Sequence, residues 1–209
     1  MSYLASDSET GSAAEPNAPL LDDDRLVRLA RDGAHWAMEE LVHRYRNKAF
    51  AVAYRLCSGQ KQDAEDFTQE AFLRAFRNLR KFRGHATFYT WFYRILVNVC
   101  LDGKRRQNRW QKLISPWLPW KRGENREAED VAGHSDTIKE LSNRQLSRDI
   151  DGAMQALPEK QRVAFQLKAL EGMSIAEIAQ VMGTAEGTVK SHLFRATHSL
   201  RQALKDWEG

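Results

Sequence analysis

Apolar residues recur with a helical period along most of this chain. The clearest run begins after Thr87, where they occupy the i, i+3, i+4, i+7, i+8 and i+11 positions of one helix face: Phe88, Trp91, Phe92, Ile95, Leu96 and Val99. No stretch sustains the two-residue alternation of a half-buried strand bounded by turn residues. The pattern therefore predicts an all-α fold.

Turn and capping residues divide the N-terminal half into successive helices. Acids at positions 22–24 open a short helix that Gly33 ends, because acids suit a helix start and glycine suits a break. A long helix is expected from about 34 to 57, a turn at 58–60, and another helix from about 63 to 79. The last of these has acids at its start and arginines at its end, which is the order that the helix dipole favours.

In the C-terminal half the helical period lapses and then returns. It is absent from about 107 to 139, where the run SPWLPW contains two prolines that a regular helix interior excludes. Helical spacing resumes over 141–157, and a further helix is expected over 158–172. The chain thus divides into a disordered acidic leader (1–21), a helical domain (22–106), a flexible linker (107–140) and a second helical domain (141–209).

A capping box and a glycine turn lie near the C-terminus. Ser174 and Glu177 have the spacing of a capping box, Gly183 supplies a turn, and Thr184 is expected to cap a second helix that runs to about residue 204. This is the helix-turn-helix pattern, in which the second helix enters the major groove of DNA; a plain helical hairpin is the alternative. The outward side of that helix carries side chains suited to phosphates and base edges: Thr188, Lys190, Ser191, Phe194 and Arg195.

A basic and aromatic segment occupies the middle of the chain. Between Arg74 and Lys112 there are eleven Lys or Arg residues and one acid, Asp102, interleaved with aromatic rings. Cationic charge attracts phosphate and flat rings stack on unpaired bases, so this composition favours binding of single-stranded nucleic acid. The alternative is a solvated basic face with the rings in the core. The basic loop at 81–85 and the polar Asn98 among aliphatic residues fit that alternative less well.

Charge, cysteine content and motifs narrow the class of protein. Residues 1–24 carry a charge of −6, which leaves +10 on the rest of a chain whose formal charge is +4, and a basic body favours a nucleic-acid partner. Cys57 and Cys100 lack a CxxC spacing, so we expect buried thiols rather than a disulfide or a zinc site. The sequence has no signal peptide and no long apolar run, so we expect a soluble cytoplasmic protein without membrane insertion. It has no P-loop, HExxH motif or nucleophile elbow, so we expect no enzymatic activity, metal or cofactor.

Four segments resemble the bacterial extracytoplasmic-function (ECF, group 4) sigma factors of the sigma-70 family. They are DAEDFTQEAF at 63–72, FRGHATFYTWFYRILVN at 82–98, LPEKQR at 157–162, and EGMSIAEIA at 171–179 continuing to GTVKSHLFR at 187–195. A helix-turn-helix is shared by many regulators, but here all four segments occur in the order and spacing of this family. Two features depart from its common pattern: the linker is richer in Trp and Pro, and His85 and Leu96 replace commoner residues.

The resemblance implies a role for each domain. The first domain would be sigma region 2, in which Phe82, Arg83, Gly84, His85 and Asn98 would hold a flipped base of the promoter −10 element. Arg105 and Arg106 would also bind −10 DNA. The second would be region 4, which would read the −35 element with Thr188, Lys190, Ser191, Phe194 and Arg195. Core RNA polymerase would be bound through its clamp helices and flap, the clamp helices meeting Asp63, Asp66, Gln69, Glu70 and Phe72. An anti-sigma protein is a further expected partner.

The resulting hypothesis is an alternative sigma factor that directs transcription initiation by recognising −35 DNA and opening −10 DNA. The acidic patch on the 63–79 helix has a second interpretation, in which its acids serve only to cap that helix. A stand-alone helix-turn-helix regulator is the main alternative function, since GTVKSH at 187–192 also suits response-regulator effector domains. A regulatory adaptor that binds a protein through the Trp-rich linker is another, but it leaves the basic segment unexplained.

Overall fold

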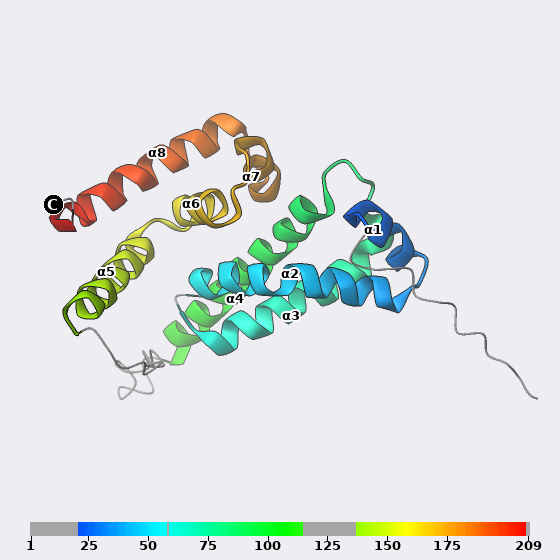
Figure 1. The fold of residues 1–209 in the computed structure, drawn as a ribbon, viewed down its shortest axis with the longest axis horizontal. Helices are drawn as coiled ribbons and strands as arrows, with labels where there is room; N and C mark the ends of the chain where they lie inside the picture. The colour runs from blue at the N-terminus through cyan, green and yellow to red at the C-terminus, as the bar shows by residue number, and fades with distance from the viewer. Residues whose placement is uncertain (1–20, 58, 115–136, 208–209) are drawn as a thin grey trace, which may run out of the picture.

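The structure is a computed structural model that describes residues 21–57, 59–114 and 137–207, apart from the side chains of 111–114, 137–144 and 206. Every regular element in these ranges is helical, which confirms the all-α prediction. The predicted disordered leader and most of the predicted linker lie outside the described residues. The helices, labelled in Figure 1, are α1 (Asp23–Arg31), α2 (His35–Leu56), α3 (Lys61–Asn78), α4 (Phe88–Ile114), α5 (Thr137–Ala156), α6 (Glu159–Glu171), α7 (Ile175–Met182) and α8 (Glu186–Ala203), with 3-10 turns η2 (Leu79–Lys81) and η3 (Lys205–Trp207).

Local signals set most helix ends close to the predicted positions. The Asp22 carboxylate accepts a 2.8 Å hydrogen bond from the backbone amide of Arg25 at the start of α1. Gly33, with φ of +100°, makes the turn into α2 in a conformation that favours glycine. Gly172 and Gly183 end α6 and α7 in the left-handed region, as is common at helix C-termini.

Three helix ends differ from the predictions, and one of them is the start of α5, which begins at Thr137 and not near residue 141. The helix of the basic segment, α4, continues to Ile114 and does not end near residue 106. Residues 104–114 contain no glycine or proline that would interrupt the helix, and a helix exposed to solvent can form without periodic apolar residues. Thr184 does not cap α8, whose N-cap is Ala185 without a side-chain hydrogen bond. The Thr184 amide instead donates to the Ala179 carbonyl at 3.0 Å and closes the end of α7.

Helices α1–α4 form an N-terminal unit around an aromatic core. Phe72 of α3 stacks on Phe92 of α4 with ring centroids 4.5 Å apart, and Tyr93 is fully buried beside them. Gly103 lets α4 pack against the Phe67 ring of α3, because a Cβ atom placed there would lie 2.2 Å from that ring. A bulkier residue at this position would therefore push the two helices or the ring apart.

Helices α5–α8 form a C-terminal unit in which α8 packs on α5, α6 and α7. One small apolar cluster lies between α5 and α8: Met154, Leu157, Ala196 and Leu200. The larger cluster includes Leu167 of α6 and Ile178 of α7, and it is shared with the N-terminal unit.

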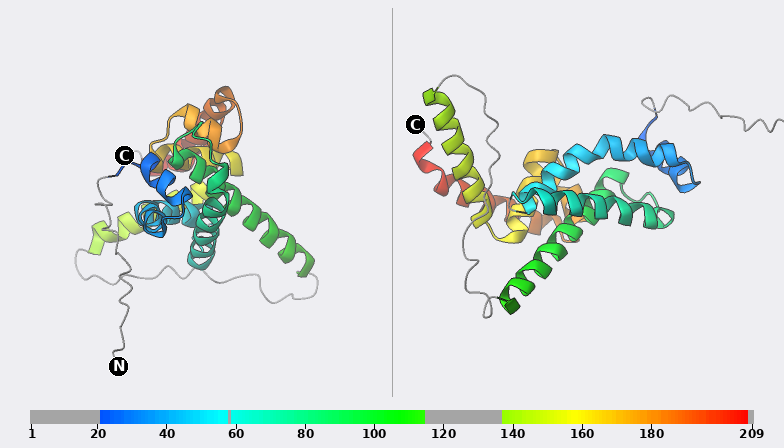
Figure 2. Two further views of the ribbon diagram at one scale, coloured as in Figure 1. Left: turned by 90° about the vertical axis from the view of Figure 1, so that its right-hand side faces the viewer. Right: turned by 90° about the horizontal axis from the view of Figure 1, so that it is seen from below.

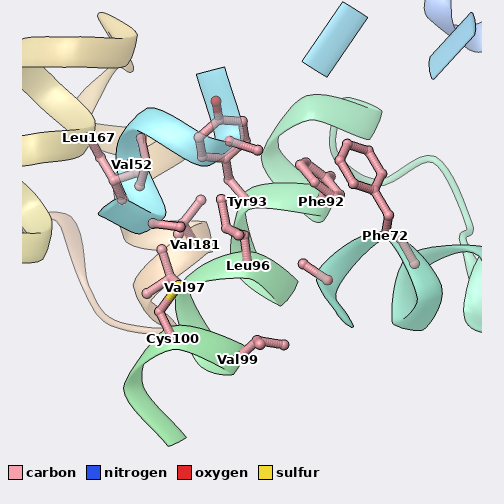
Figure 3. Packing of buried hydrophobic residues seen from close by; sticks show 14 of the residues in the cluster. Val52, Phe72, Phe92, Tyr93, Leu96, Val97, Val99, Cys100, Leu167 and Val181 are labelled. Atoms are coloured by element: carbon pink, nitrogen blue, oxygen red, sulfur yellow. The ribbon is translucent and has the colours of Figure 1, made fainter. Parts of the chain in front are cut away.

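The two units pack against each other, a contact that the sequence analysis did not predict. α7 lies against α4 and α6 lies against α2, as the views of Figure 2 also show. In Figure 3, Leu167 lies beside Val52, and Val181 lies beside Leu96 and Val97. One hydrophobic core therefore crosses the boundary between the units.

Candidate nucleic-acid interface

The loop before α4 is anchored by one aromatic ring and is otherwise exposed. Phe82 is half-buried and packs on Trp91 of α4, with ring centroids 5.1 Å apart. Arg83, Gly84 and His85 are exposed, and Gly84 has a φ of +72°, which allows the chain to turn there. The packed ring fixes the base of the loop, while the neighbouring cation and imidazole are free to meet a ligand.

α4 continues this surface with polar and basic side chains. Asn98 is exposed between two buried valines, and Arg105 and Arg106 are exposed further along. Asn98 lies ~15 Å along the helix axis from the start of α4. Arg105 forms ion pairs with Glu159 at 2.9 Å and with Asp102 at 3.9 Å. The residues predicted to bind −10 DNA are together called the loop–helix surface: Phe82, Arg83, Gly84, His85, Asn98, Arg105 and Arg106.

The capping box predicted at the start of α7 is present. The Ser174 hydroxyl accepts a hydrogen bond from the Glu177 amide at 3.2 Å, and the Glu177 carboxylate accepts one from the Ser174 amide at 2.8 Å. Both bonds satisfy donors that the helix start would otherwise leave open. Gly183 then turns the chain into α8, so α7 and α8 form the helix-turn-helix geometry.

One side of α8 is buried in the C-terminal unit, and the side predicted to contact −35 DNA is exposed. Val189, Ala196 and Leu200 are buried. All five residues predicted to contact −35 DNA are exposed, and we call them the recognition-helix surface: Thr188, Lys190, Ser191, Phe194 and Arg195. Phe194 is 75% exposed, so its ring is available to a partner.

The positive charge of the recognition-helix surface comes from Lys190 and Arg195. Burial, and then the neighbouring Lys160 and Arg195, lower the pKa of His192 below its ordinary value near 6.5. The His192 imidazole is therefore neutral at neutral pH, because protonation would add a charge beside two others.

An acidic surface lies on α3, a different helix from those of the two basic surfaces. Asp66 and Gln69 are exposed and Asp63 and Glu70 are half-buried; these four residues are the α3 surface. The Glu70 carboxylate pairs with Arg74 at 2.6 Å, and Asp63 accepts a 2.8 Å hydrogen bond from the side chain of Gln107. These neighbours fix the carboxylates but leave the surface open.

The structure corrects the assignment of Phe72 to this surface. Phe72 is 6% exposed and stacks on Phe92, so it holds α3 against α4 instead of meeting a partner. Leu73 was missed by the sequence analysis: it is 44% exposed and lies four residues after Gln69, on the same side of the helix. That spacing, together with an aliphatic residue outside the buried period, was the available signal.

Two tyrosines and one glutamate join the units. Both phenol hydroxyls, of Tyr89 and Tyr93, donate to the same Oε2 of Glu171 at 2.7 Å. Burial, and then this hydrogen bond, raise the pKa of each tyrosine above its ordinary value. Both hydroxyls therefore stay protonated and donate at any physiological pH. No sequence pattern indicated this contact, whose partners are about 80 residues apart.

Cys57 and Cys100 are both free and buried, as predicted. The pKa of Cys100 is raised, first by its hydrogen bond with Cys57 and then by burial, so its thiol stays protonated. Within the described ranges, no three His, Cys, Asp or Glu side chains gather as a metal site would need. In the same part of the chain, no helix is long and apolar enough to cross a bilayer.

Two family descriptions match the chain. "Sigma-70 region 2" matches residues 41–110, which hold the loop–helix and α3 surfaces, and "Sigma-70, region 4" matches residues 147–197, which hold the recognition-helix surface. The ECF RNA polymerase sigma-E factor of Haemophilus influenzae is 33% identical over 197 residues, covering 90% of this chain and 98% of that protein. The RNA polymerase sigma-H factor of Pseudomonas aeruginosa is 34% identical over 197 residues, covering 88% and 94%.

Solved structures show the same fold. The chain resembles CnrH in its complex with the cytosolic domain of CnrY, with a TM-score of 0.62, 25% identity, and coverage of 90% of this chain and 100% of that one. It also resembles the sigma factor RpoE of Bartonella quintana in complex with the anti-sigma factor NepR, with a TM-score of 0.62, 25% identity, and coverage of 80% and 96%.

Proposed function

This chain belongs to the ECF RNA polymerase sigma factors, and from that premise we propose which of its surfaces performs each task of promoter recognition. It is an alternative sigma factor, a transcription initiation factor that gives core RNA polymerase its promoter specificity. One observation carries the assignment of surfaces. Two separate surfaces, one a loop with a basic helix and the other the second helix of a helix-turn-helix, are both largely exposed on one chain.

The loop–helix surface is proposed to capture the −10 element, as part of sigma region 2 at residues 22–106. Its Phe82 ring is fixed by Trp91, so a base that leaves the duplex meets a surface that is already ordered. Unstacking and unpairing that base costs a few kcal/mol, which stacking and phosphate contacts by Arg83 and Arg106 would offset. Asn98, ~15 Å along α4, would contact a different nucleotide from the one at the loop.

The recognition-helix surface is proposed to read the −35 element, as part of sigma region 4 at residues 141–209. α8 is held by α7, which the capping box stabilises, so its exposed side can enter the major groove as a rigid body. Lys190 and Arg195 suit phosphates and guanine edges, and Phe194 or Thr188 suits a thymine methyl.

The α3 surface is proposed to dock on the clamp helices of core polymerase, with Leu73 as its apolar centre. Leu73 shares the helix side of Gln69 and Asp66 and is 44% exposed. An apolar side chain rimmed by charged ones is the usual make-up of a protein contact. Region 4 would meet the polymerase flap.

The chain is proposed to act without chemistry or a cofactor of its own, in the cytoplasm, where core polymerase and promoter DNA are found. Two relatives of known structure are complexes with another protein, and one of these partners is named as an anti-sigma factor. We propose that an anti-sigma factor likewise restrains this chain.

The experiment that tests these proposals is run-off transcription from a randomised promoter library, using bacterial core polymerase with and without this protein. We expect transcripts only when both are present, with enriched elements at −35 and −10. If no transcription occurs and the free protein binds a specific duplex tightly, the stand-alone regulator is the better description.

A further inference from the structure

His192 lies on the same side of α8 as two residues of the recognition-helix surface, although it was not assigned to that surface. It follows Thr188 by four residues and precedes Arg195 by three, and side chains at these spacings are neighbours on a helix. Histidine is the side chain whose charge changes most readily near neutral pH. A role for His192 in binding DNA therefore deepens the proposed reading of the −35 element and rests on that proposal.

The imidazole of His192 is half-buried, with one nitrogen covered and the other open. Its Nδ1 is buried and has no hydrogen-bond partner among the described residues, whereas its Nε2 is not one of the buried polar atoms. Water can accept a hydrogen bond from Nε2–H but nothing accepts one from Nδ1–H, so the neutral ring carries its hydrogen on Nε2. An N–H group at the surface of α8 is thus placed to donate to a phosphate oxygen.

Burial and two cations oppose a second proton on this ring. Burial is the largest cause that lowers the pKa of His192, and the charges of Lys160 on α6 and Arg195 on α8 lower it further. Within the described ranges, no acid of α5, α6, α7 or α8 offsets these two cations. Glu159, the neighbour of Lys160 in sequence, forms an ion pair with Arg105 at 2.9 Å. In the free chain, α8 therefore presents an uncharged donor beside two fixed positive charges.

Duplex DNA would reverse the charge effects on this ring. A recognition helix in the major groove is flanked by two backbones, each with a phosphate every ~3.4 Å along the axis. A phosphate that meets Arg195 offsets the repulsion that this cation exerts on His192, and a phosphate within reach of Nε2 attracts the second proton directly. Binding of DNA and protonation of His192 then favour each other.

We propose that His192 is a further contact to −35 DNA, and that it binds a phosphate as an imidazolium, so that the chain takes up a proton from solvent when it reads this element. The proton returns to solvent when the DNA dissociates. The extra affinity is complete below the pKa of His192 in the free chain and is lost as the pH rises through its higher pKa in the complex. The affinity for the −35 element should therefore increase as the pH falls.

Fluorescence anisotropy of a labelled duplex measures this dependence with the holoenzyme, formed from core polymerase and the full chain. The duplex carries the −35 element enriched in the promoter library and no −10 element, so that promoter opening does not contribute. We expect the affinity of the parent to rise about ten-fold more than that of His192→Gln between about pH 8 and about pH 6. His192→Arg, which is charged at every pH, should gain no more with acid than His192→Gln and should bind more tightly near pH 8. The control His198→Gln changes another histidine of α8, which is exposed, and should keep the dependence of the parent.

Each result separates this inference from the proposed function. Equal gains with acid in the parent and in His192→Gln overturn the proton uptake, and so does a gain that His198→Gln abolishes. A second duplex with the −35 element scrambled reports on the proposed function: equal binding of both duplexes at every pH removes the −35 reading itself.

Histidine NMR of the free chain checks the starting state without DNA, even if His192→Gln does not fold. His192 should titrate below its ordinary value near 6.5, and Lys160→Ala, which removes an exposed cation of α6, should raise that midpoint. A midpoint at or above the ordinary value in the parent would mean that the ring is not kept neutral before it meets DNA, and this too overturns the inference.

Discussion

The two surfaces proposed to bind DNA differ in how much of their geometry a single helix supplies. All five residues of the recognition-helix surface lie on α8, and all are exposed around the buried Val189 and Ala196. The loop–helix surface combines a loop with α4 and extends ~15 Å from the loop end to Asn98. The first stands on one helix, whereas the second combines residues of two elements.

This difference matches two kinds of DNA. A preformed convex helix suits duplex DNA, whose major groove accepts a helix without large distortion. A surface with an anchored ring, exposed cations and a separated amide suits a strand whose bases have left the stack. We therefore expect substitutions on α8 to change affinity for duplex DNA, and substitutions on the loop–helix surface to change promoter opening.

The largest effect should come from Arg195→Ala. Loss of a base or phosphate contact by an arginine costs about 1–3 kcal/mol, so binding of the holoenzyme to a promoter with a −35 element should weaken about 10–100-fold. A promoter that lacks the element should be bound almost as before. The control is Arg201→Ala, which removes another exposed arginine of α8 outside the recognition-helix surface. Equal losses on both promoters would remove the recognition role.

Asn98→Ala should have a somewhat smaller effect, confined to promoter opening. We expect a loss of about 2 kcal/mol, seen as roughly 30-fold fewer open complexes by permanganate reactivity, with duplex binding nearly unchanged. Asn47→Ala on α2 alters another exposed asparagine and should have no effect. If opening and the preferred −10 bases survive Asn98→Ala, Asn98 is not part of the −10 surface.

One glycine in each unit should respond in opposite ways to the same substitution, because Gly103 is buried and Gly152 is exposed. Gly103→Ala places a Cβ within 2.2 Å of the Phe67 ring between α3 and α4, and such overpacking should lower the free energy of unfolding by about 1–3 kcal/mol. Gly152→Ala on α5 meets no atom within 4 Å, so its better helix propensity should raise stability by about 0.5–1 kcal/mol. Chemical denaturation of both variants checks the signs. A stabilised Gly103→Ala would show that the Phe67 ring moves aside at little cost.

Features set by short stretches of sequence could be predicted, because neighbouring residues determine them. The capping box of Ser174 and Glu177 and the exposed side of α8 follow from spacing alone. Phe72 was assigned to a surface through the family motif, although the helical period already placed it with Ala64, Ala71 and Ala75, which are buried. Where motif and period disagreed about burial, the period was right.

Contacts between distant segments could not be predicted. Tyr93 and Glu171 are 78 residues apart, and nothing in either neighbourhood encodes the other. The apolar period of α4 shows that a face is buried but does not reveal that α7 of the second unit covers part of it. The end of α4 was also missed, since residues 107–114 remain helical without an apolar face to mark them.

The smallest effect expected on promoter binding is that of Ser174→Ala, and it separates cap stability from DNA reading. Loss of the cap should cost about 1 kcal/mol of stability, and Asp22→Ala at the cap of α1 should cost a similar amount. Only Ser174→Ala should also weaken −35 binding, by a few-fold, since α7 supports α8 and α1 does not contact it closely.

The same cap should give the C-terminal unit a dependence on acid. Hydrogen bonds from the Ser174 backbone and then from its side chain lower the pKa of Glu177 below its ordinary value near 4.5. A carboxyl group whose pKa is lower in the folded state stabilises fully above the unfolded value, and this stabilisation is lost as the pH falls through the folded value. Thermal unfolding from pH 7 to about pH 3 should therefore show a shallower acid loss in Ser174→Ala than in the parent. An identical slope in both would mean that the hydroxyl of Ser174 does not hold the Glu177 carboxylate in solution.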